Sequence, residues 1–171
     1  MNLTFYIFFT FIVYSFAGWL IEGVYSLYSN GTFKKEGFFI GPVKPMYGIA
    51  MTILIICYEI LKIGKIPLII LCFIIPTAVE YISGDLLKRI FNKIYWSYSD
   101  LNFNINGYIC LKFSLYWCVL SYIGVVYINK LFSYIYIINS TLIDKVSVLM
   151  IFLYIVDLIL SIMHCLKYRN I

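Results

Sequence analysis

Five long apolar runs, separated by short polar stretches, set the plan of this chain. They cover residues of about 4–27, 46–61, 66–82, 109–128 and 146–166. An apolar run of about 20 residues is long enough to cross a bilayer as a helix. No small-residue cleavage site ends the first run, so we expect a membrane helix there and not a signal peptide. The pattern predicts an all-α integral membrane protein, a bundle of about five transmembrane helices in one multi-pass domain over residues 1–171.

Shorter features refine this plan. The apolar stretch 131–143 has only about a dozen residues, too few to cross a bilayer, so we expect a helix extension or an interfacial segment. Pro76 inside the third run predicts a kink, because proline removes a helical hydrogen bond. Gly64 and Pro67 predict a tight reversal between the second and third runs.

Two connections between runs are unusual for solvent loops. Residues 34–48 contain three glycines and two prolines that fix turns, together with apolar side chains too numerous for a free loop. In residues 101–106, apolar residues alternate with asparagines, which is typical of a short extended segment lying on an apolar surface. We therefore expect two ordered loops on the cytoplasmic face, with residues 34–48 packed against residues 96–107.

Composition agrees with a membrane protein and excludes several other classes. The chain is 63% hydrophobic and 12% charged, with a mean hydropathy of +0.94, whereas soluble domains are near half apolar and a quarter charged. The net charge of +5 is scattered between the runs, so the expected partner is the lipid bilayer and not a nucleic acid. Five cysteines without a CxxC pair and a single histidine predict no metal site.

The scattered charges also predict an orientation. One side of the membrane would hold eight Lys and Arg residues and the other side four. Because cytoplasmic loops carry the excess of positive charge, we expect a cell-membrane protein with its N-terminus outside and its C-terminus inside. The eight are Lys34, Lys35, Lys44, Lys88, Arg89, Lys93, Lys167 and Arg169, and the four are Lys62, Lys65, Lys130 and Lys145.

Two carboxylates inside the apolar runs are the main candidates for a site. Glu22 lies late in the first run and Glu80 late in the third, so both face the same side of the membrane. An unpaired carboxylate is costly at such depth and marks a functional-site hypothesis. Lys112, early in the fourth run, faces that side too and could neutralise one carboxylate. We predict a substrate-binding pocket that holds Glu22 and Glu80 and is lined by Trp19, Tyr47, Thr77 and Tyr81, with Lys112 nearby.

Other charged residues have plain structural explanations. Glu59 lies three residues before Lys62 near a helix end, which favours an interfacial ion pair. Asp157 forms a polar stripe with Ser161 and His164, and either a packing hydrogen bond or a functional role explains it. Lys112 either acts on a carboxylate or extends its ammonium group to the interface.

Several short motifs occur together in the first three quarters of the chain. In order they are Tyr14-Ser15, Gly18-Trp19, Glu22, Gly37-Phe38, Gly41-Pro42, Pro45, Tyr47-Gly48, Thr77, Glu80-Tyr81, Gly84, Trp96, Tyr98-Ser99, Asn106-Gly107, Ile109-Cys110-Leu111, Ser114 and Trp117. Over residues of about 5–125 the chain resembles small bacterial membrane proteins catalogued as putative ABC-transporter type IV. It departs from their pattern at Lys35-Glu36, where Asn-Arg is expected, and at Ser97 and Tyr108, where Asp and Arg are expected.

The resemblance implies a function in transport. The sequence has no GxxxxGK[ST], GxSxG or HExxH motif, so we expect no cofactor and no catalytic residue of those kinds. Our first hypothesis is a permease-like subunit without its own ATPase, in a homo-oligomer or with a partner membrane or ATPase subunit. The alternatives are an enzyme or binder acting on a lipid or lipid-linked substrate at the cytoplasmic face, and an accessory subunit of a membrane complex.

Overall fold

The computed structural model describes residues 2–33 and 37–167, and it is helical apart from one small hairpin. Within these residues four helices are long and apolar enough to cross a membrane: α1, α3, the continuous helix Leu111–Ile138 and α6. The elements in order are α1 (Leu3–Asn30), α2 (Pro45–Ile55), the π-helical turn η1 (Ile56–Ile60), α3 (Lys65–Phe91), β1 (Asn104–Ile105), β2 (Ile109–Cys110), α4 (Leu111–Ile123), the π-helical turn η2 (Gly124–Ile128), α5 (Asn129–Ile138) and α6 (Ser140–Lys167).

The observed helices follow the five apolar runs, but only four of them, and not the predicted five, are long enough to count as membrane-crossing helices among the described residues. The second run forms a continuous helix, Pro45–Ile60, that is shorter than the other four and packs against both α1 and α3. Part of the stretch 131–143 is the predicted helix extension, since the fourth run continues to Ile138 before the chain turns at Asn139. Helix α3 runs through Pro76 without ending.

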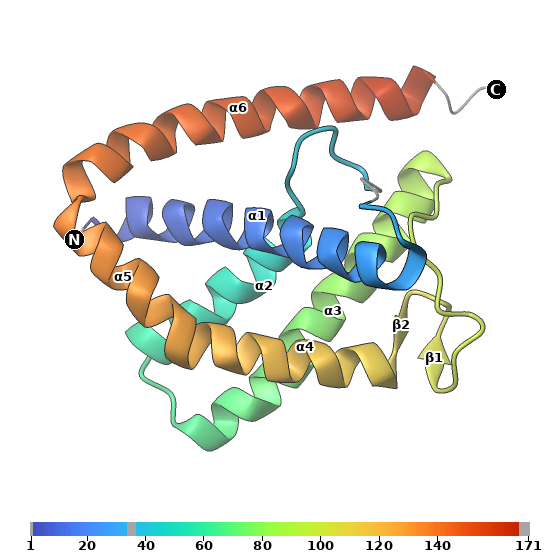
Figure 1. Ribbon diagram of the computed structural model, residues 1–171, viewed down its shortest axis with the longest axis horizontal. Helices are drawn as coiled ribbons and strands as arrows, with labels where there is room; N and C mark the ends of the chain where they lie inside the picture. The colour runs from blue at the N-terminus through green and yellow to red at the C-terminus, as the bar shows by residue number, and fades with distance from the viewer. Residues whose placement is uncertain (1, 34–36, 168–171) are drawn as a thin grey trace.

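The helices alternate in direction (Figure 1). Helices α1, α3 and α6 run toward one end of the molecule, and α2 and the α4–α5 helix run back. The C-terminal ends of α1 and α3, the hairpin and the start of α4 meet at that first end, here called the loop end. Helix α6 lies along the outside of the bundle, where it contacts α1.

Two glycines allow α1 and α2 to approach closely. A Cβ atom on Gly18 would lie 2.2 Å from the ring of Tyr47. A Cβ atom on Gly48 would lie 2.2 Å from the Ser15 hydroxyl oxygen and 2.5 Å from the carbonyl oxygen of Phe11. Small residues at such crossings bring backbones together in membrane helices. The consequence for the site is that Tyr47 lies directly against α1.

A buried polar network ties three elements together, α1, η1 and α5, at the end opposite the loop end. The Asn129 side-chain amide donates to Glu59 Oε1 at 2.7 Å and to the Tyr6 hydroxyl at 2.9 Å. The Tyr6 hydroxyl donates to Glu59 Oε2 at 2.8 Å and lies 2.6 Å from the Ser133 hydroxyl. Glu59 is therefore held by neutral donors from α1 and α5, and not by the expected ion pair with Lys62. These residues (Tyr6, Glu59, Asn129 and Ser133) are called the Glu59 network.

The first loop packs on α6. The Gly41 N–H donates to both carboxylate oxygens of Asp157, at 3.0 and 2.9 Å, and the Ile40 N–H donates to the Ser161 hydroxyl at 3.1 Å. Phe39 stacks on Tyr154. Turn backbone groups need acceptors when they lie against apolar surface, and the polar stripe of α6 supplies them. The packing explanation therefore accounts for Asp157.

The hydrogen bonds of Ile40 and Gly41 go to α6, whereas Lys44 and Tyr47 line one cavity with residues 96–98. The predicted packing of this loop against residues 96–107 as a whole stays a prediction. Lys34, Lys35 and Glu36, which the prediction included, lie outside the described residues. The second loop folds on itself: Asn104 donates to the Leu101 carbonyl at 2.7 Å and accepts from the Gly107 N–H at 3.2 Å. Its alternating residues include the short strand of a hairpin, in which Asn104 and Ile105 pair with Cys110 and Ile109, and Phe103 is 80% exposed.

Candidate functional site

Glu22 is paired with a lysine from the first loop. Its carboxylate forms an ion pair with the Lys44 ammonium group and accepts a hydrogen bond from the Tyr47 hydroxyl at 2.6 Å. Lys44 is held in place because its backbone N–H donates to the Ser15 carbonyl at 2.9 Å and α2 begins at the next residue, Pro45. Two helices and the loop thus fix one neutralised carboxylate at the loop end of the bundle.

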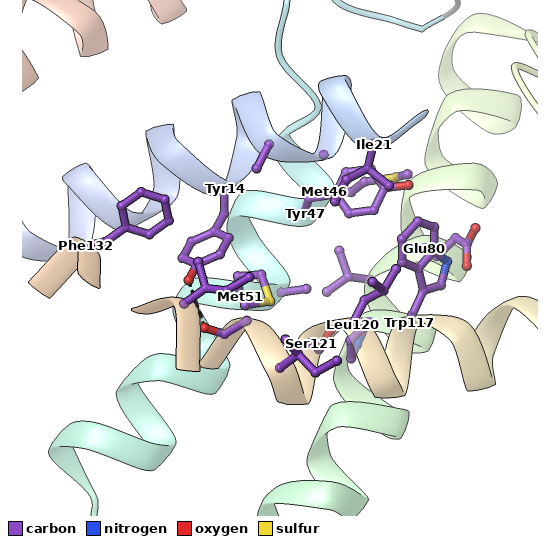
Figure 2. Close-up of a pocket in the computed structure, with 18 residues that line it drawn as sticks. Tyr14, Ile21, Met46, Tyr47, Met51, Glu80, Trp117, Leu120, Ser121 and Phe132 are labelled. Atoms are coloured by element: carbon purple, nitrogen blue, oxygen red, sulfur yellow. Dashed lines mark hydrogen bonds between the residues drawn. The ribbon is translucent and has the colours of Figure 1, made fainter. Parts of the chain in front are cut away.

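Glu80 is more deeply buried, at 4% exposure, and has a different set of partners. Its Oε1 accepts a hydrogen bond from the Tyr98 hydroxyl at 2.9 Å. Its Oε2 is buried and has no hydrogen-bond partner of good geometry among the described residues. The indole of Trp117 lies beside the carboxylate (Figure 2). A buried acceptor left unsatisfied costs about 1–3 kcal/mol, so Oε2 is the most poorly compensated atom of the site.

The fold of the second loop places the Tyr98 hydroxyl within hydrogen-bond distance of Glu80. A Cβ atom on Gly84 would lie 3.0 Å from the ring of Tyr108, so the glycine, one turn beyond Glu80, lets the loop settle on α3. The Trp96 indole N–H donates to the Tyr108 carbonyl at 2.9 Å. Burial, followed by the nearby charge of Glu80, raises the pKa of Tyr98, so its hydroxyl stays protonated and acts as a donor.

Both carboxylates line one cavity at the loop end, here called the vestibule. Its volume is about 490 Å³, and its walls come from α1, the start of α2, α3, α4 and the second loop. The lining residues are Ile21, Glu22, Tyr25, Ser26, Ser29, Asn30, Lys44, Met46, Tyr47, Glu80, Tyr95, Trp96, Ser97, Tyr98, Phe113, Tyr116, Trp117 and Leu120.

A second, smaller cavity, the chamber, adjoins the vestibule inside the bundle and shares part of its wall. It has a volume of about 200 Å³ and almost entirely apolar walls (Figure 2). The chamber is lined by Tyr14, Ala17, Gly18, Ile21, Met46, Tyr47, Ala50, Met51, Pro76, Val79, Glu80, Trp117, Leu120, Ser121, Ile123, Gly124, Ile128 and Phe132. The residues shared by both cavities are Ile21, Met46, Tyr47, Glu80, Trp117 and Leu120.

The far end of the chamber adjoins the Glu59 network. The Tyr14 hydroxyl donates to the Gly124 carbonyl at 3.2 Å, drawn as a dashed line in Figure 2, and to Asn129 Oδ1 at 3.3 Å. Asn129 in turn belongs to the Glu59 network. The cavity system is therefore polar at its entrance, apolar within, and bounded by a hydrogen-bonded floor.

The structure brings three of the predicted site residues together: Glu22, Tyr47 and Glu80. The other four lie outside the vestibule lining. Trp19 stacks on Phe16, and Thr77 donates to the carbonyl of its own helix at Phe73. The remaining two residues, Tyr81 and Lys112, have partners near the loop end other than Glu22 and Glu80.

Tyr81 accepts a hydrogen bond from Asn106 at 2.8 Å and supports the second loop. Lys112 is exposed, with its ammonium group 5.9 Å from the ring centre of Phe113. The cation beside Glu22 is Lys44, which the sequence analysis counted only as an orientation charge. A usable signal was present: Lys44 precedes the helix-starting Pro45, and Tyr47 follows on the first turn of the same helix.

Two further residues were missed, Tyr98 and Trp117. Tyr98 lies in an aromatic cluster typical of an interfacial anchor, and only the fold of the loop over Gly84 shows that it reaches Glu80. Among the described residues there is no group of three His, Cys, Asp or Glu side chains that could hold a metal ion. The chemistry that these residues offer is charge pairing, hydrogen bonding and contact with aromatic rings.

Comparison with known proteins gives one match. A family model described as putative ABC-transporter type IV matches residues 9–162. The match extends beyond the motifs of residues 5–125 and includes most of α6 as well as the entire cavity system. No curated protein and no solved structure matches the chain.

Proposed function

This chain belongs to the putative ABC-transporter type IV family, and we propose that it acts as a permease-like subunit whose ATPase is a separate partner. The family supports a transport-related membrane protein. The observation that carries the finer proposal is the pair of adjoining cavities, vestibule and chamber, with Glu80 in the wall of both. A polar entrance leading into the interior of an apolar bundle is what a substrate path through such a protein requires.

The geometry separates substrate binding from substrate movement, and only the movement calls for a partner. The cavities lie within one chain, so one subunit suffices to bind a substrate. Passage to the other side would require Tyr14 and the Glu59 network to separate, at the cost of several buried hydrogen bonds. With no nucleotide-binding motif in the sequence, the energy for that step would come from a partner subunit that hydrolyses ATP.

A test of this function uses the complex isolated from native membranes. We expect an ATPase subunit to copurify, and proteoliposomes of the complex to move a component of the native lipid or solute extract when ATP is added. Glu22→Gln and Glu80→Gln should each abolish this movement while the protein still inserts and folds. The matched control is Asp85→Asn, because Asp85 forms a surface pair with Arg89 on the same helix as Glu80. Isolation without any ATPase, and no ATP-dependent movement, would contradict the proposal.

The second candidate, a lipid-acting enzyme, is favoured by the unpartnered Oε2 of Glu80 next to the protonated Tyr98 hydroxyl. A carboxylate and a phenol placed together can act as base and acid on one substrate. A chemically altered lipid, released without ATP by the purified protein and not by Glu80→Gln, would support this candidate over the permease.

We further propose that the N-terminus is outside the cell and the C-terminus inside, so that the vestibule opens to the cytoplasm. The support is the excess of Lys and Arg at the loop end, together with α1 and α6 running in the same direction. In a cysteine-free background, Asn2→Cys should react with an impermeant thiol reagent in intact cells. Asn170→Cys, which lies beyond the described residues, should react only after permeabilisation. Equal reactivity of the two positions in intact cells would rule out this topology.

A further inference from the structure

We propose that the vestibule and chamber bind a cationic amphiphile, a molecule with one ammonium head group and an apolar tail. The head group would contact Glu80 and the tail would enter the chamber. This inference rests on the proposed function in taking the same cavity as the substrate path, but binding can be measured without transport.

The first support is the unpartnered oxygen of Glu80. The residue is buried, and Oε1 is satisfied by Tyr98, whereas Oε2 has no partner of good geometry among the described residues. Glu80 lines both the vestibule and the chamber. A ligand that donates a hydrogen bond at this point would satisfy Oε2, and an ammonium group would do so with the added strength of opposite charges.

The second support is the balance of charge around the vestibule. Its described lining contains two carboxylates, Glu22 and Glu80, and one ammonium group, Lys44. Lys44 forms its ion pair with Glu22, and no ion pair joins it or another described cation to Glu80. A positively charged ligand would bring the vestibule to neutrality, and an anionic ligand would add a third negative charge. Electrostatics therefore selects a cation over an anion of the same shape.

The third support is the aromatic character of the vestibule. Eight of its eighteen lining residues are aromatic: Tyr25, Tyr47, Tyr95, Trp96, Tyr98, Phe113, Tyr116 and Trp117. The faces of aromatic rings carry partial negative charge and attract cations, and cages of such rings recognise ammonium groups in proteins. Carboxylates combined with aromatic rings form a suitable head-group site for an amine.

The chamber explains why the ligand should also carry a tail. Its walls are apolar, with side chains such as Ile21, Ala50, Met51 and Val79, and Glu80 is part of its lining. A small soluble amine would leave this apolar space unfilled. An alkyl chain attached to the amine would bury its methylenes there, and the removal of this apolar surface from water favours binding.

The test compares three ligands that share a twelve-carbon tail: dodecylamine, dodecanol and dodecanoate. Binding to the purified full-length protein in a non-ionic detergent is followed by radioligand binding and by tryptophan fluorescence, since two of the three tryptophans, Trp96 and Trp117, line the vestibule. Dodecylamine should bind at least about tenfold more tightly than the other two, because it alone brings a positive charge to the Glu80 carboxylate as well as a hydrogen-bond donor. Equal affinity for the three ligands would overturn the inference, and this comparison needs no variant.

Variants then assign the head-group site. Glu80→Gln should weaken dodecylamine binding at least about tenfold and leave dodecanol binding unchanged, because the substitution removes the charge and keeps the shape. Asp85→Asn should change neither affinity, and gel filtration should show that both variants are folded. Unchanged dodecylamine affinity in Glu80→Gln would overturn the assignment. If the amine binds as expected but ATP drives no movement, the transport proposal fails and the ligand class stands. If ATP drives movement but the protein binds dodecanol or dodecanoate more tightly than dodecylamine, the transport proposal stands and the ligand class is wrong.

Discussion

Replacing Gly48 with alanine is expected to destabilise the whole bundle. The added Cβ atom would lie 2.2 Å from the Ser15 hydroxyl oxygen and 2.5 Å from the Phe11 carbonyl oxygen. The hydroxyl can rotate, but a helix carbonyl cannot move without shifting α1. Overpacking of this kind costs about 1–3 kcal/mol and sometimes more, and we expect the upper end of that range because a backbone atom is in the way.

The effect should reach the vestibule, because Tyr47 is the residue before Gly48. Separation of α1 and α2 would break the hydrogen bond between Tyr47 and Glu22. The measurement is thermal unfolding in detergent, followed by circular dichroism. Gly64→Ala is the matched control: Gly64 lies just before α3 with φ −65°, and the nearest atom to an added Cβ, on Pro67, is 3.7 Å away. Equal melting temperatures for the two variants would contradict the close-packing account.

Asn129→Leu is expected to give the second large loss of stability. Asn129 is fully buried, at 0% exposure, and its amide is the central member of the Glu59 network. Leucine keeps the approximate size but removes the donors to Glu59 and Tyr6, and the acceptor for Tyr14. Unsatisfied buried partners cost about 1–3 kcal/mol each, and more for a charged group, so we expect a total loss of about 3 kcal/mol or more.

A double-mutant cycle tests whether this loss comes from the network. Glu59→Gln and Asn129→Leu should be less than additive in unfolding free energy, because the two substitutions disrupt the same hydrogen bonds. The control is Asn139→Ala: Asn139 is exposed, and its side-chain amide donates a hydrogen bond to the Ile135 carbonyl in the turn before α6. Fully additive losses from the first pair would mean that each residue contributes to stability independently of the other.

The long helices could be predicted because the length and apolar content of a run are local properties. For this reason the first, third, fourth and fifth runs correspond closely to α1, α3, the Leu111–Ile138 helix and α6. The second run was predicted equally well as a helix. Its short length was visible in the run 46–61, whereas its place between α1 and α3 depends on contacts with residues distant in the sequence, such as Gly48 against Phe11.

The site was predicted only in part, because partners were chosen by position along the chain. Glu22, Tyr47 and Glu80 could be placed at one end by counting along the apolar runs. Lys112 was predicted as the cation that neutralises a carboxylate, but Lys44 pairs with Glu22. Counting along the runs could not show this, since the position of Lys44 depends on a loop that is held by Asp157 and Ser161 of α6. Glu59 is a similar case. It lies in the π-helical turn Ile56–Ile60, whose wider turn changes the side chain's direction relative to a regular helix.

Helix α6 holds the loop that carries Lys44, the positively charged residue at the vestibule. Its Asp157 holds Gly41, and only residues 42–43 separate Gly41 from Lys44, with the ring of Pro42 limiting the slack between them. A shift of α6 along α1 would therefore strain the turn between Gly41 and Lys44, because Asp157 holds one end of this turn and the Ser15 carbonyl of α1 holds the other. A molecule that bound the outer face of α6 and shifted this helix would act on the ion pair between Lys44 and Glu22, and so on the electrostatic potential in the vestibule.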